Sequence, residues 1–194
     1  RIILAGDHFQ LPPVVKSREA EQGGLKITML EKCMEKKDVS VLLNIQYRMH
    51  NAIMEFSNTV FYDNQLQADV SVKDVLLSND EDYPLLNRAI DFVDTAGCGY
   101  DELQNPETLS LYNPEEANLL WKHLKKLIED LGYASGKEMD LSIGIIAPYK
   151  SHIELLKEQL SEIDLSDEIK KRIAVKTIDG FQGEERDIIY ISFV

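Results

Sequence analysis

Short apolar runs alternate along this chain with segments in which apolar residues recur every three or four positions. The runs predict buried strands, because a strand covered on both faces carries apolar side chains throughout. The segments between them have the period of an amphipathic helix. Strands joined by helices of this length favour an α/β fold with a mostly parallel sheet flanked by helices. The expected strands are residues 1–5, 39–43, 141–147, 173–178 and 187–194, and the expected helices are residues 25–36, 51–61, 114–131 and 151–160.

The segment from residue 114 to residue 131 carries the strongest helical signal. Asn113 has a side chain that caps helix N-termini, and Pro114 suits the first helical position. Gly132 follows the last residue of the apolar stripe, so we expect the helix to end there.

Acidic residues are concentrated in one part of the chain. The sequence has 34 acidic and 21 basic residues, a formal net charge of −13, and residues 63–116 account for eleven of those thirteen excess charges. The rest of the chain is nearly balanced, so the net charge does not exclude a nucleic-acid partner. Residues 63–111 also have weak periodicity, apart from one expected strand near residues 90–93. We interpret residues 63–111 as an acidic excursion from the sheet.

Composition excludes several classes of protein. Hydrophobic residues make up 44% and charged residues 28% of the chain, which argues against a disordered protein. No run of about 18 apolar residues is present, so we expect no membrane partner. Cys33 and Cys98 are too few for a disulfide framework or a zinc site, so we expect no metal ligands and a reducing, cytoplasmic or nuclear, compartment.

Ligands of parallel α/β sheets bind beyond the carboxyl ends of the strands, and polar residues follow the first two expected strands here. The segment GDHFQLPP at residues 6–13 contains Gln10, whose amide could orient a water or sense a phosphate oxygen. The segment QYRMH at residues 46–50 contains Tyr47, which could stack on a base, and Arg48, whose guanidinium matches phosphate oxygens. A proline-stiffened connection and a surface arginine packed on a tyrosine are the alternatives.

Two later segments carry similar signals. Residues 147–152 combine an aromatic, a base and a helix N-terminus whose free amides could contact phosphate, although a plain helix start is the alternative. Residues 175–187 place two glycines, a phenylalanine and a glutamine among six charged side chains. Because glycine lets the backbone approach a ligand closely, a functional loop is favoured there.

Taken in this order, GDHFQLPP, QYRMH, APY and TIDGFQGEERD resemble the motifs of the superfamily 1 helicases, in the 5′-to-3′ branch of the nonsense-mediated-decay and immunoglobulin-mu-binding helicases. These enzymes have two RecA-like P-loop NTPase domains, with ATP and Mg²⁺ between them and a nucleic-acid strand across both. The resemblance implies that residues 1–37 end the first domain with its connection, and that residues 38–194 form most of the second, truncated at both ends. The chain would then be part of an ATP-dependent helicase that moves on single-stranded RNA or DNA and unwinds duplexes.

The resemblance also implies roles for individual residues. Gln10 would sense the γ-phosphate of ATP, and Arg48 would be an arginine finger, which contributes a factor of about 10³–10⁵ in comparable enzymes. The residues expected to contact the nucleotide are Tyr47, Gly183 and Glu185, and those expected to contact the strand are Pro148, Tyr149 and Thr177.

The chain departs from the family pattern at three positions: Asn51 replaces a proline, His152 a glutamine and Glu184 an arginine. It also has no G-x-x-x-x-G-K-S/T phosphate loop and no Walker-B motif, so we expect the 194 residues alone not to hydrolyse ATP. Two alternatives remain. One is a non-catalytic helicase-like scaffold that binds a protein through the acidic residues 63–116. The other is a phosphate-loop NTPase that does not bind nucleic acid.

Overall fold

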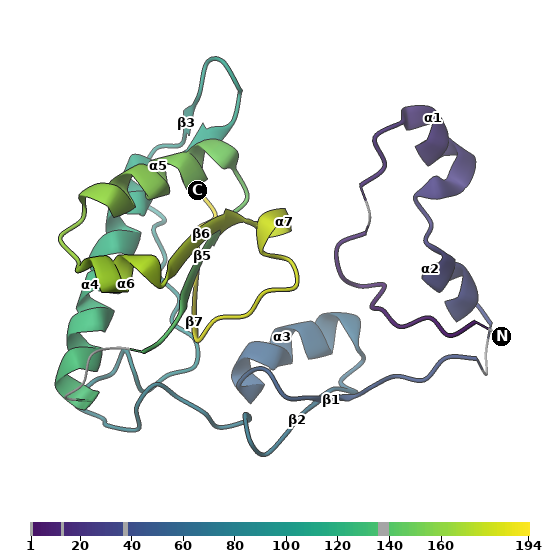
Figure 1. Cartoon of the computed structure of the whole chain (residues 1–194), viewed down its shortest axis with the longest axis horizontal. Helices are drawn as coiled ribbons and strands as arrows, with labels where there is room; N and C mark the ends of the chain where they lie inside the picture. Colours follow the sequence, from purple (N-terminus) through teal and green to yellow (C-terminus); the bar gives the residue numbers. More distant parts are fainter. Residues whose placement is uncertain (1, 13, 37–38, 136–139) are drawn as a thin grey trace. The chain divides into compact units, whose positions relative to one another are not determined.

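The computed structural model describes residues 2–12, 14–36, 39–135 and 140–194 (Figure 1). The chain forms two compact units, Arg1–Val75 and Leu76–Val194. The domain boundary expected after residue 37 falls outside the described residues and stays a prediction. No helix within the described ranges is both long enough and apolar enough to cross a membrane.

The first unit consists of short helices and one pair of two-residue strands. The strands run parallel, with Ile45 opposite Gln67. The helix expected at residues 51–61 is confirmed as α3. The elements of this unit are α1 (Arg18–Ala20), a π-helical turn (Glu21–Leu25), α2 (Met29–Met34), β1 (Ile45–Gln46), α3 (Asn51–Phe61) and β2 (Gln67–Ala68).

Three predictions for this unit are wrong in place or extent. No strand forms at residues 2–5 or 39–43, where Ile3 and Leu43 are 95% and 88% exposed. Among the described residues of this unit, β1 and β2 pair with each other and with neither of these runs. The helix expected at residues 25–36 is confined to α2. Gly24, at φ 93°, breaks the helix before it, and Thr28 begins a new helix with a capping box.

The second unit is built on a three-stranded parallel sheet in the order β6-β5-β7 (Figure 1). Ile143 of the central strand pairs with Ile173 on one side and with Ile188 on the other. The parallel α/β architecture expected from the alternating pattern is therefore confirmed. The elements are β3 (Leu103–Gln104), β4 (Leu111–Tyr112), α4 (Pro114–Ser135), β5 (Ile143–Ala147), α5 (Lys150–Glu162), α6 (Asp167–Lys171), β6 (Ile173–Thr177), α7 (Ile178–Phe181) and β7 (Ile188–Ile191).

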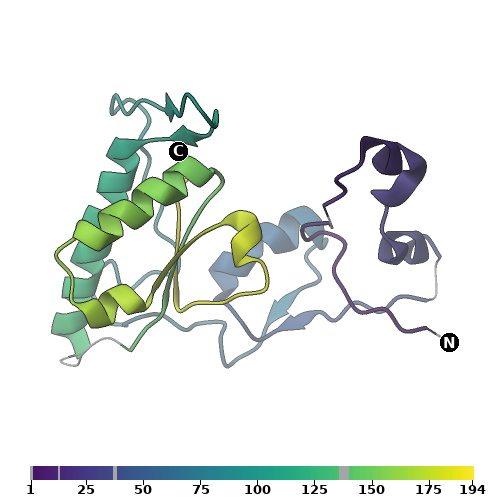
Figure 2. The same ribbon diagram turned by 45° about the horizontal axis from the view of Figure 1, so that its top comes forward.

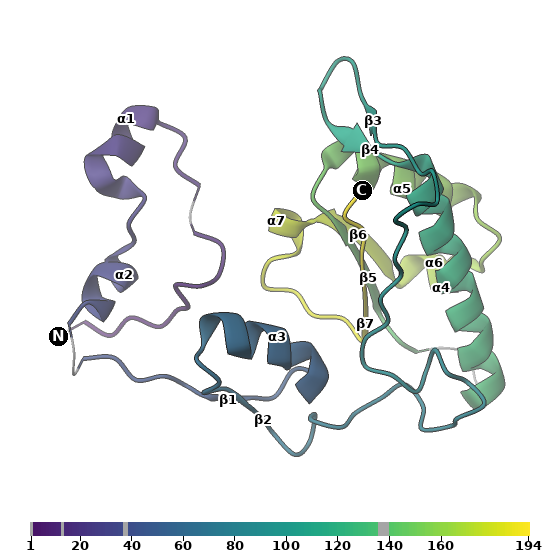
Figure 3. The ribbon, with the colours of Figure 1, turned by 180° about the vertical axis from the view of Figure 1, so that it is seen from behind.

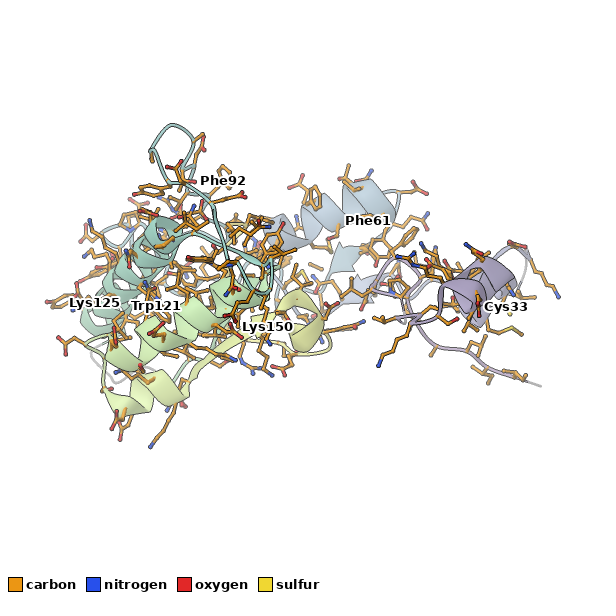
Figure 4. The ribbon with its side chains drawn as sticks, turned by 90° about the horizontal axis from the view of Figure 1, so that it is seen from above. Cys33, Phe61, Phe92, Trp121, Lys125 and Lys150 are labelled. Atoms are coloured by element: carbon orange, nitrogen blue, oxygen red, sulfur yellow. The ribbon has the colours of Figure 1, made fainter. Side chains whose placement is uncertain are left out.

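The two faces of this sheet are covered differently. Figures 2 and 3 show α4, α5 and α6 on one side of the sheet and α7 on the other. Ile143 and Ile145 are fully buried in the core that α4 and α5 complete, and the single tryptophan, Trp121, lies in the same core (Figure 4). On the opposite face, Gly144 lies against Phe181 of α7, so closely that a Cβ at position 144 would be 2.8 Å from the ring.

Several details of the second unit differ from expectation. Helix α4 passes through Gly132 and ends at Ser135, because Gly132 keeps helical geometry. No strand forms at residues 90–93, and Phe92 is 80% exposed (Figure 4). The β3–β4 hairpin and α6 were not expected. Each is too short to give a readable periodicity.

Residues 76–111, the part of the acidic excursion in this unit, are joined to the core. Leu86 is fully buried and belongs to the core cluster. Asp91 accepts a hydrogen bond from Nε2 of His123 on α4 (3.1 Å), and the Thr95 hydroxyl donates to Glu116 on the same helix (2.8 Å). The excursion is therefore more closely integrated than a surface insertion.

Candidate functional site

Gln10 lies in a turn that Asp7 organises. The side-chain amide of Gln10 donates to one Asp7 carboxylate oxygen (2.9 Å), and the Phe9 backbone amide donates to the other (3.1 Å). The hydroxyl of Tyr62, just after α3, also donates to Asp7. Three donors on one carboxylate fix the turn and the direction of the Gln10 side chain.

The charge state of this turn follows from the same contacts. Burial raises the pKa of Tyr62 to about 12, and the hydrogen bond to Asp7 acts in the same direction. Burial also opposes ionisation of Asp7, but hydrogen bonds from Tyr62 and Gln10 outweigh it and lower the pKa of Asp7 below its usual range. At neutral pH, Asp7 is therefore a carboxylate and Tyr62 keeps its proton.

Tyr47 and Arg48 are presented by a turn that Gln46 holds. The Oε1 atom of Gln46 accepts hydrogen bonds from the backbone amides of Arg48 (2.8 Å) and Met49 (2.9 Å), and Nε2 donates to the Met49 carbonyl (2.8 Å). The side chains of Tyr47 and Arg48 are exposed. The sequence analysis missed this positioning role of Gln46. A polar side chain two and three residues before the amides that it bonds is the local signal that could have indicated it.

The residues after this turn explain the first departure from the family pattern. His50 caps α3, because its Nδ1 accepts a hydrogen bond from the Ala52 amide (3.0 Å). The Asn51 amide donates to the Lys73 carbonyl (3.0 Å). A proline at position 51 has no N–H and could not make this contact.

In the second unit, the three residues expected to contact the nucleic-acid strand lie at the carboxyl ends of β5 and β6. Ala147 and Thr177 are register partners in neighbouring parallel strands, so the loops after β5 and β6 leave the sheet side by side (Figure 1). Pro148 and Tyr149 follow β5, and Tyr149 is 37% exposed. The Thr177 hydroxyl accepts a hydrogen bond from the Gly180 amide (3.3 Å) and caps α7, so the strand ends one residue earlier than expected.

One amide at the amino end of α5, where the sequence suggested a phosphate contact, already has a hydrogen-bond partner. The Ser151 amide donates to the Ser110 hydroxyl (3.0 Å), and the hydroxyls of Thr108 and Ser151 are 3.4 Å apart. The loop between β3 and β4 therefore occupies this amide. Lys150, the first residue of α5, lies 3.6 Å from Glu154 (Figure 4).

The loop between α7 and β7 is shaped by Gly183. This residue has φ 82°, and the Glu184 amide that follows it donates to the Phe181 carbonyl (3.0 Å). The left-handed conformation explains why glycine is needed here. Glu185 is exposed, and its neighbour Glu184 contacts Lys176 and Arg186 (2.7 Å to the latter).

His152, the second departure from the family pattern, is fully buried, so its side chain is not exposed to a nucleic-acid strand. Its Nδ1 accepts a hydrogen bond from the Asn113 amide (3.2 Å), and its Nε2 lies 3.0 Å from the Ser192 hydroxyl. Burial lowers the pKa of His152, although the charge of Glu116 acts in the opposite direction. The imidazole joins α5 to the N-terminus of α4 and to the end of β7.

The expected site residues thus belong to both units. Gln10, Tyr47 and Arg48 lie in the first, and the residues from Pro148 to Glu185 lie in the second. In the described part of the chain, no group of three or more His, Cys, Asp or Glu side chains could hold a metal ion. Asp7 is already bonded by three donors, so these residues do not form a Mg²⁺ site by themselves.

Comparisons with known proteins agree with this architecture. A family described as "AAA domain" matches residues 25–194. Over its whole length the chain is 36% identical to DNA-binding protein SMUBP-2 of Rattus norvegicus. It is 33% identical to DNA polymerase alpha-associated DNA helicase A and, over its whole length, 31% identical to ATP-dependent helicase NAM7, both of Saccharomyces cerevisiae. The chain spans 19%, 29% and 19% of these three proteins.

Proposed function

The chain belongs to the AAA domain family and, within it, to the superfamily 1 helicases, and from this we propose that it is the C-terminal motor portion of an ATP-dependent helicase. The whole protein would couple ATP hydrolysis to movement along single-stranded RNA or DNA and to unwinding, in the cytoplasm or nucleus. The observation that carries the proposal is the register of β5 and β6, which starts two polar loops from the paired residues Ala147 and Thr177.

We assign the loops after β5 and β6 to the nucleic-acid strand. The partly exposed ring of Tyr149 offers a base a surface for stacking, an interaction worth about 1–3 kcal/mol per base. Pro148 fixes the backbone before this ring, since proline restricts φ. The capped turn at Thr177 presents its backbone to the strand at the same edge of the sheet.

We assign a second set of residues to the nucleotide. Bound Mg²⁺-ATP supplies the phosphoanhydride bond that is broken and the cation that neutralises its phosphates. Gln10 would orient the attacking water, and Arg48 would stabilise the charge that develops on the transferred phosphoryl group. The remaining contacts would be stacking by Tyr47, acceptance of a ribose hydroxyl by Glu185 and close backbone approach at Gly183.

The domain assignment and the inactivity of the isolated chain are part of the proposal. Residues 1–37 would end the first RecA-like domain, and residues 38–194 would form most of the second. The 194 residues contain no G-x-x-x-x-G-K-S/T segment, which would cradle the phosphates. We therefore expect this chain alone to show no ATP turnover, and turnover above a blank reaction would contradict the assignment.

The central experiment uses the full-length parent protein. Arg48→Ala should reduce the single-strand-stimulated ATPase rate by about 10³-fold or more, because the arginine-finger charge is lost. Binding of a single strand should change little. Arg18→Ala, at an exposed arginine of α1, is the matched control and should retain activity. An unchanged rate in Arg48→Ala would exclude the finger assignment, and an ATPase indifferent to RNA and DNA would exclude the helicase.

The acidic excursion favours one alternative function, a scaffold that binds a protein partner. It carries most of the excess negative charge, and Phe92 is exposed within it. A parent protein with a degraded phosphate loop, and with no ATPase, would support the scaffold. An intact phosphate loop and ATPase stimulated by a single strand would support the motor.

A further inference from the structure

Glu184 lies between two cations. One carboxylate oxygen contacts Nζ of Lys176 on β6, and the other accepts a hydrogen bond from Nη2 of Arg186 (2.7 Å). All three side chains are partly buried, with exposures of 30% for Glu184, 37% for Lys176 and 25% for Arg186. The contact with Lys176, followed by that with Arg186, lowers the pKa of Glu184, so the carboxylate is charged at neutral pH.

The positions of these groups are fixed by other contacts. The left-handed turn at Gly183 places Glu184, whose amide is bonded to the Phe181 carbonyl. Arg186 donates from Nη1 to the Glu185 carbonyl (2.6 Å), and its guanidinium lies 5.5 Å from the centre of the Phe181 ring. Arg186 therefore keeps contacts that do not depend on the Glu184 carboxylate.

The chemistry of the cation pair matches a phosphate group. One carboxylate bridges an ammonium and a guanidinium with its two oxygens, and two oxygens of one phosphate can accept the same two donors. Lys176 directly precedes Thr177, and Arg186 directly follows Glu185. Along the chain, the pair therefore flanks a residue assigned to the nucleic-acid strand and a residue assigned to the nucleotide.

We propose that Lys176 and Arg186 bind a phosphate group of the ligand, and that Glu184 is a built-in competitor that the phosphate must displace. The inference rests on the proposed function, because that function brings phosphates to this loop. A carboxylate on the same loop competes at high effective concentration, so it weakens phosphate binding without touching the ligand. Glu184 would thus keep the affinity for phosphate low, which suits a site that must release its ligand repeatedly.

The test compares the 194-residue chain with its Glu184→Gln variant. Binding of a fluorescent oligodeoxythymidylate is measured over a salt series, and binding of ADP is measured separately. The variant should bind one of these ligands about tenfold more tightly at low salt. If the oligonucleotide is that ligand, its salt dependence should steepen by roughly 0.7 per cation released, as for single strands. A gain with the oligonucleotide identifies a backbone phosphate, and a gain with ADP identifies a nucleotide phosphate.

Asp140→Asn is the matched control. It removes the same charge and releases Arg172, the partner of Asp140. Arg172 directly precedes β6, whereas Lys176 lies near the other end of that strand. We expect no comparable gain from it. The double variant Glu184→Gln/Lys176→Gln should lose most of the gain, and thermal unfolding should show that all three variants fold.

Suppose that the unmodified chain binds the oligonucleotide, and that Glu184→Gln binds neither the oligonucleotide nor ADP more tightly than Asp140→Asn does. This result would overturn the inference about Glu184 and leave the proposed function standing. Absence of binding by the unmodified chain and by Glu184→Gln, with both ligands, would overturn the inference together with the proposed strand contacts. The ATPase of the parent protein, measured with Arg48→Ala as above, tests the proposed function independently of this loop.

Discussion

The imidazole Nδ1 of His152, in α5, accepts a hydrogen bond from the backbone amide of Asn113, which directly precedes α4 and is 39 residues away in the chain. Because Nδ1 is an acceptor, Nε2 carries the proton and donates to the Ser192 hydroxyl. Ser192 in turn lies 3.3 Å from a carboxylate oxygen of Glu116. This chain of hydrogen bonds requires a neutral imidazole.

The neutral state of His152 predicts an acid-sensitive second unit. Burial lowers its pKa in the folded chain, whereas an unfolded histidine titrates near about 6.5. As the pH falls below that value, the unfolded chain binds a proton that the folded chain does not, so the free energy of unfolding decreases. The decrease approaches about 1.4 kcal/mol per pH unit until the folded pKa is reached. Urea unfolding followed by the fluorescence of Trp121, which lies in this unit, measures it at pH values on either side of 6.5.

His152→Gln is the control for this effect. Glutamine can accept from the Asn113 amide and donate to Ser192, but it does not titrate. The pH dependence near neutrality should therefore flatten. A variant with the same pH dependence as the unmodified chain would show that another group is responsible.

A methyl group at position 144 should destabilise the same unit. The Cβ of Gly144→Ala would lie 2.8 Å from the Phe181 ring and 2.9 Å from Cδ1 of Ile189, so one of these side chains must move. Overpacking of this kind costs about 1–3 kcal/mol. Urea unfolding followed by the fluorescence of Trp121 should show a lower midpoint concentration and a free energy of unfolding reduced by that amount.

Gly132→Ala makes the same chemical change where there is space. Among the described residues outside its own turn of helix, no heavy atom lies within 4 Å of a Cβ built at position 132, and this glycine is inside α4. Replacement of a helical glycine by alanine should stabilise the unit by about 0.5–1 kcal/mol. Opposite shifts in the two variants are the expected result, and a stabilised Gly144→Ala would contradict the close contact with Phe181.

Removal of one hydroxyl should change the titration of Asp7. In Tyr62→Phe, Asp7 loses a hydrogen bond that stabilises its charged form, so its pKa should rise. The stability that depends on the lowered pKa is present above the usual range of an aspartate and is lost as the pH falls through the folded value. The variant should therefore lose stability at a higher pH.

Carboxyl carbon NMR measures this change directly. Asp69 provides an internal control, because hydrogen bonds from the backbone and hydroxyl of Ser71 lower its pKa independently of Tyr62. An unchanged Asp7 titration in Tyr62→Phe would contradict the contact between them.

The order of elements in the second unit could be predicted because strong local signals agree with one another. The side-chain oxygen Oδ1 of Asn113 accepts a hydrogen bond from the Glu116 backbone amide (3.0 Å), as the capping pattern predicted. The apolar runs at β5 and β6 are buried where a parallel sheet requires it. By contrast, the equally apolar residues 2–5 form no strand, because the two described strands of their unit pair with each other, which no local pattern indicates.

Details of the site could not be predicted where they depend on distant residues. The sequence marked His152 as a substitution in a strand-contacting motif, yet burial beneath Asn113 and Ser192 gives it a structural role. Asn51 is likewise explained by a carbonyl twenty-two residues later, that of Lys73. Contacts of this range become visible only when the fold brings the partners together.

The Ser151 amide, in the first turn of α5, donates its hydrogen bond to the hydroxyl of Ser110. A residue of the acidic excursion therefore supplies the acceptor that this helix end needs. A homologue that shortens or replaces the β3–β4 loop must bring its own acceptor, or this amide of the helix beside the proposed strand contacts becomes available to solvent and to anions. Variation in a loop that contains none of the expected binding residues would then change whether this helix end can accept a hydrogen-bond partner from a ligand. Domain exchanges that move residues 114–194 without residues 103–112 would transplant an uncapped helix.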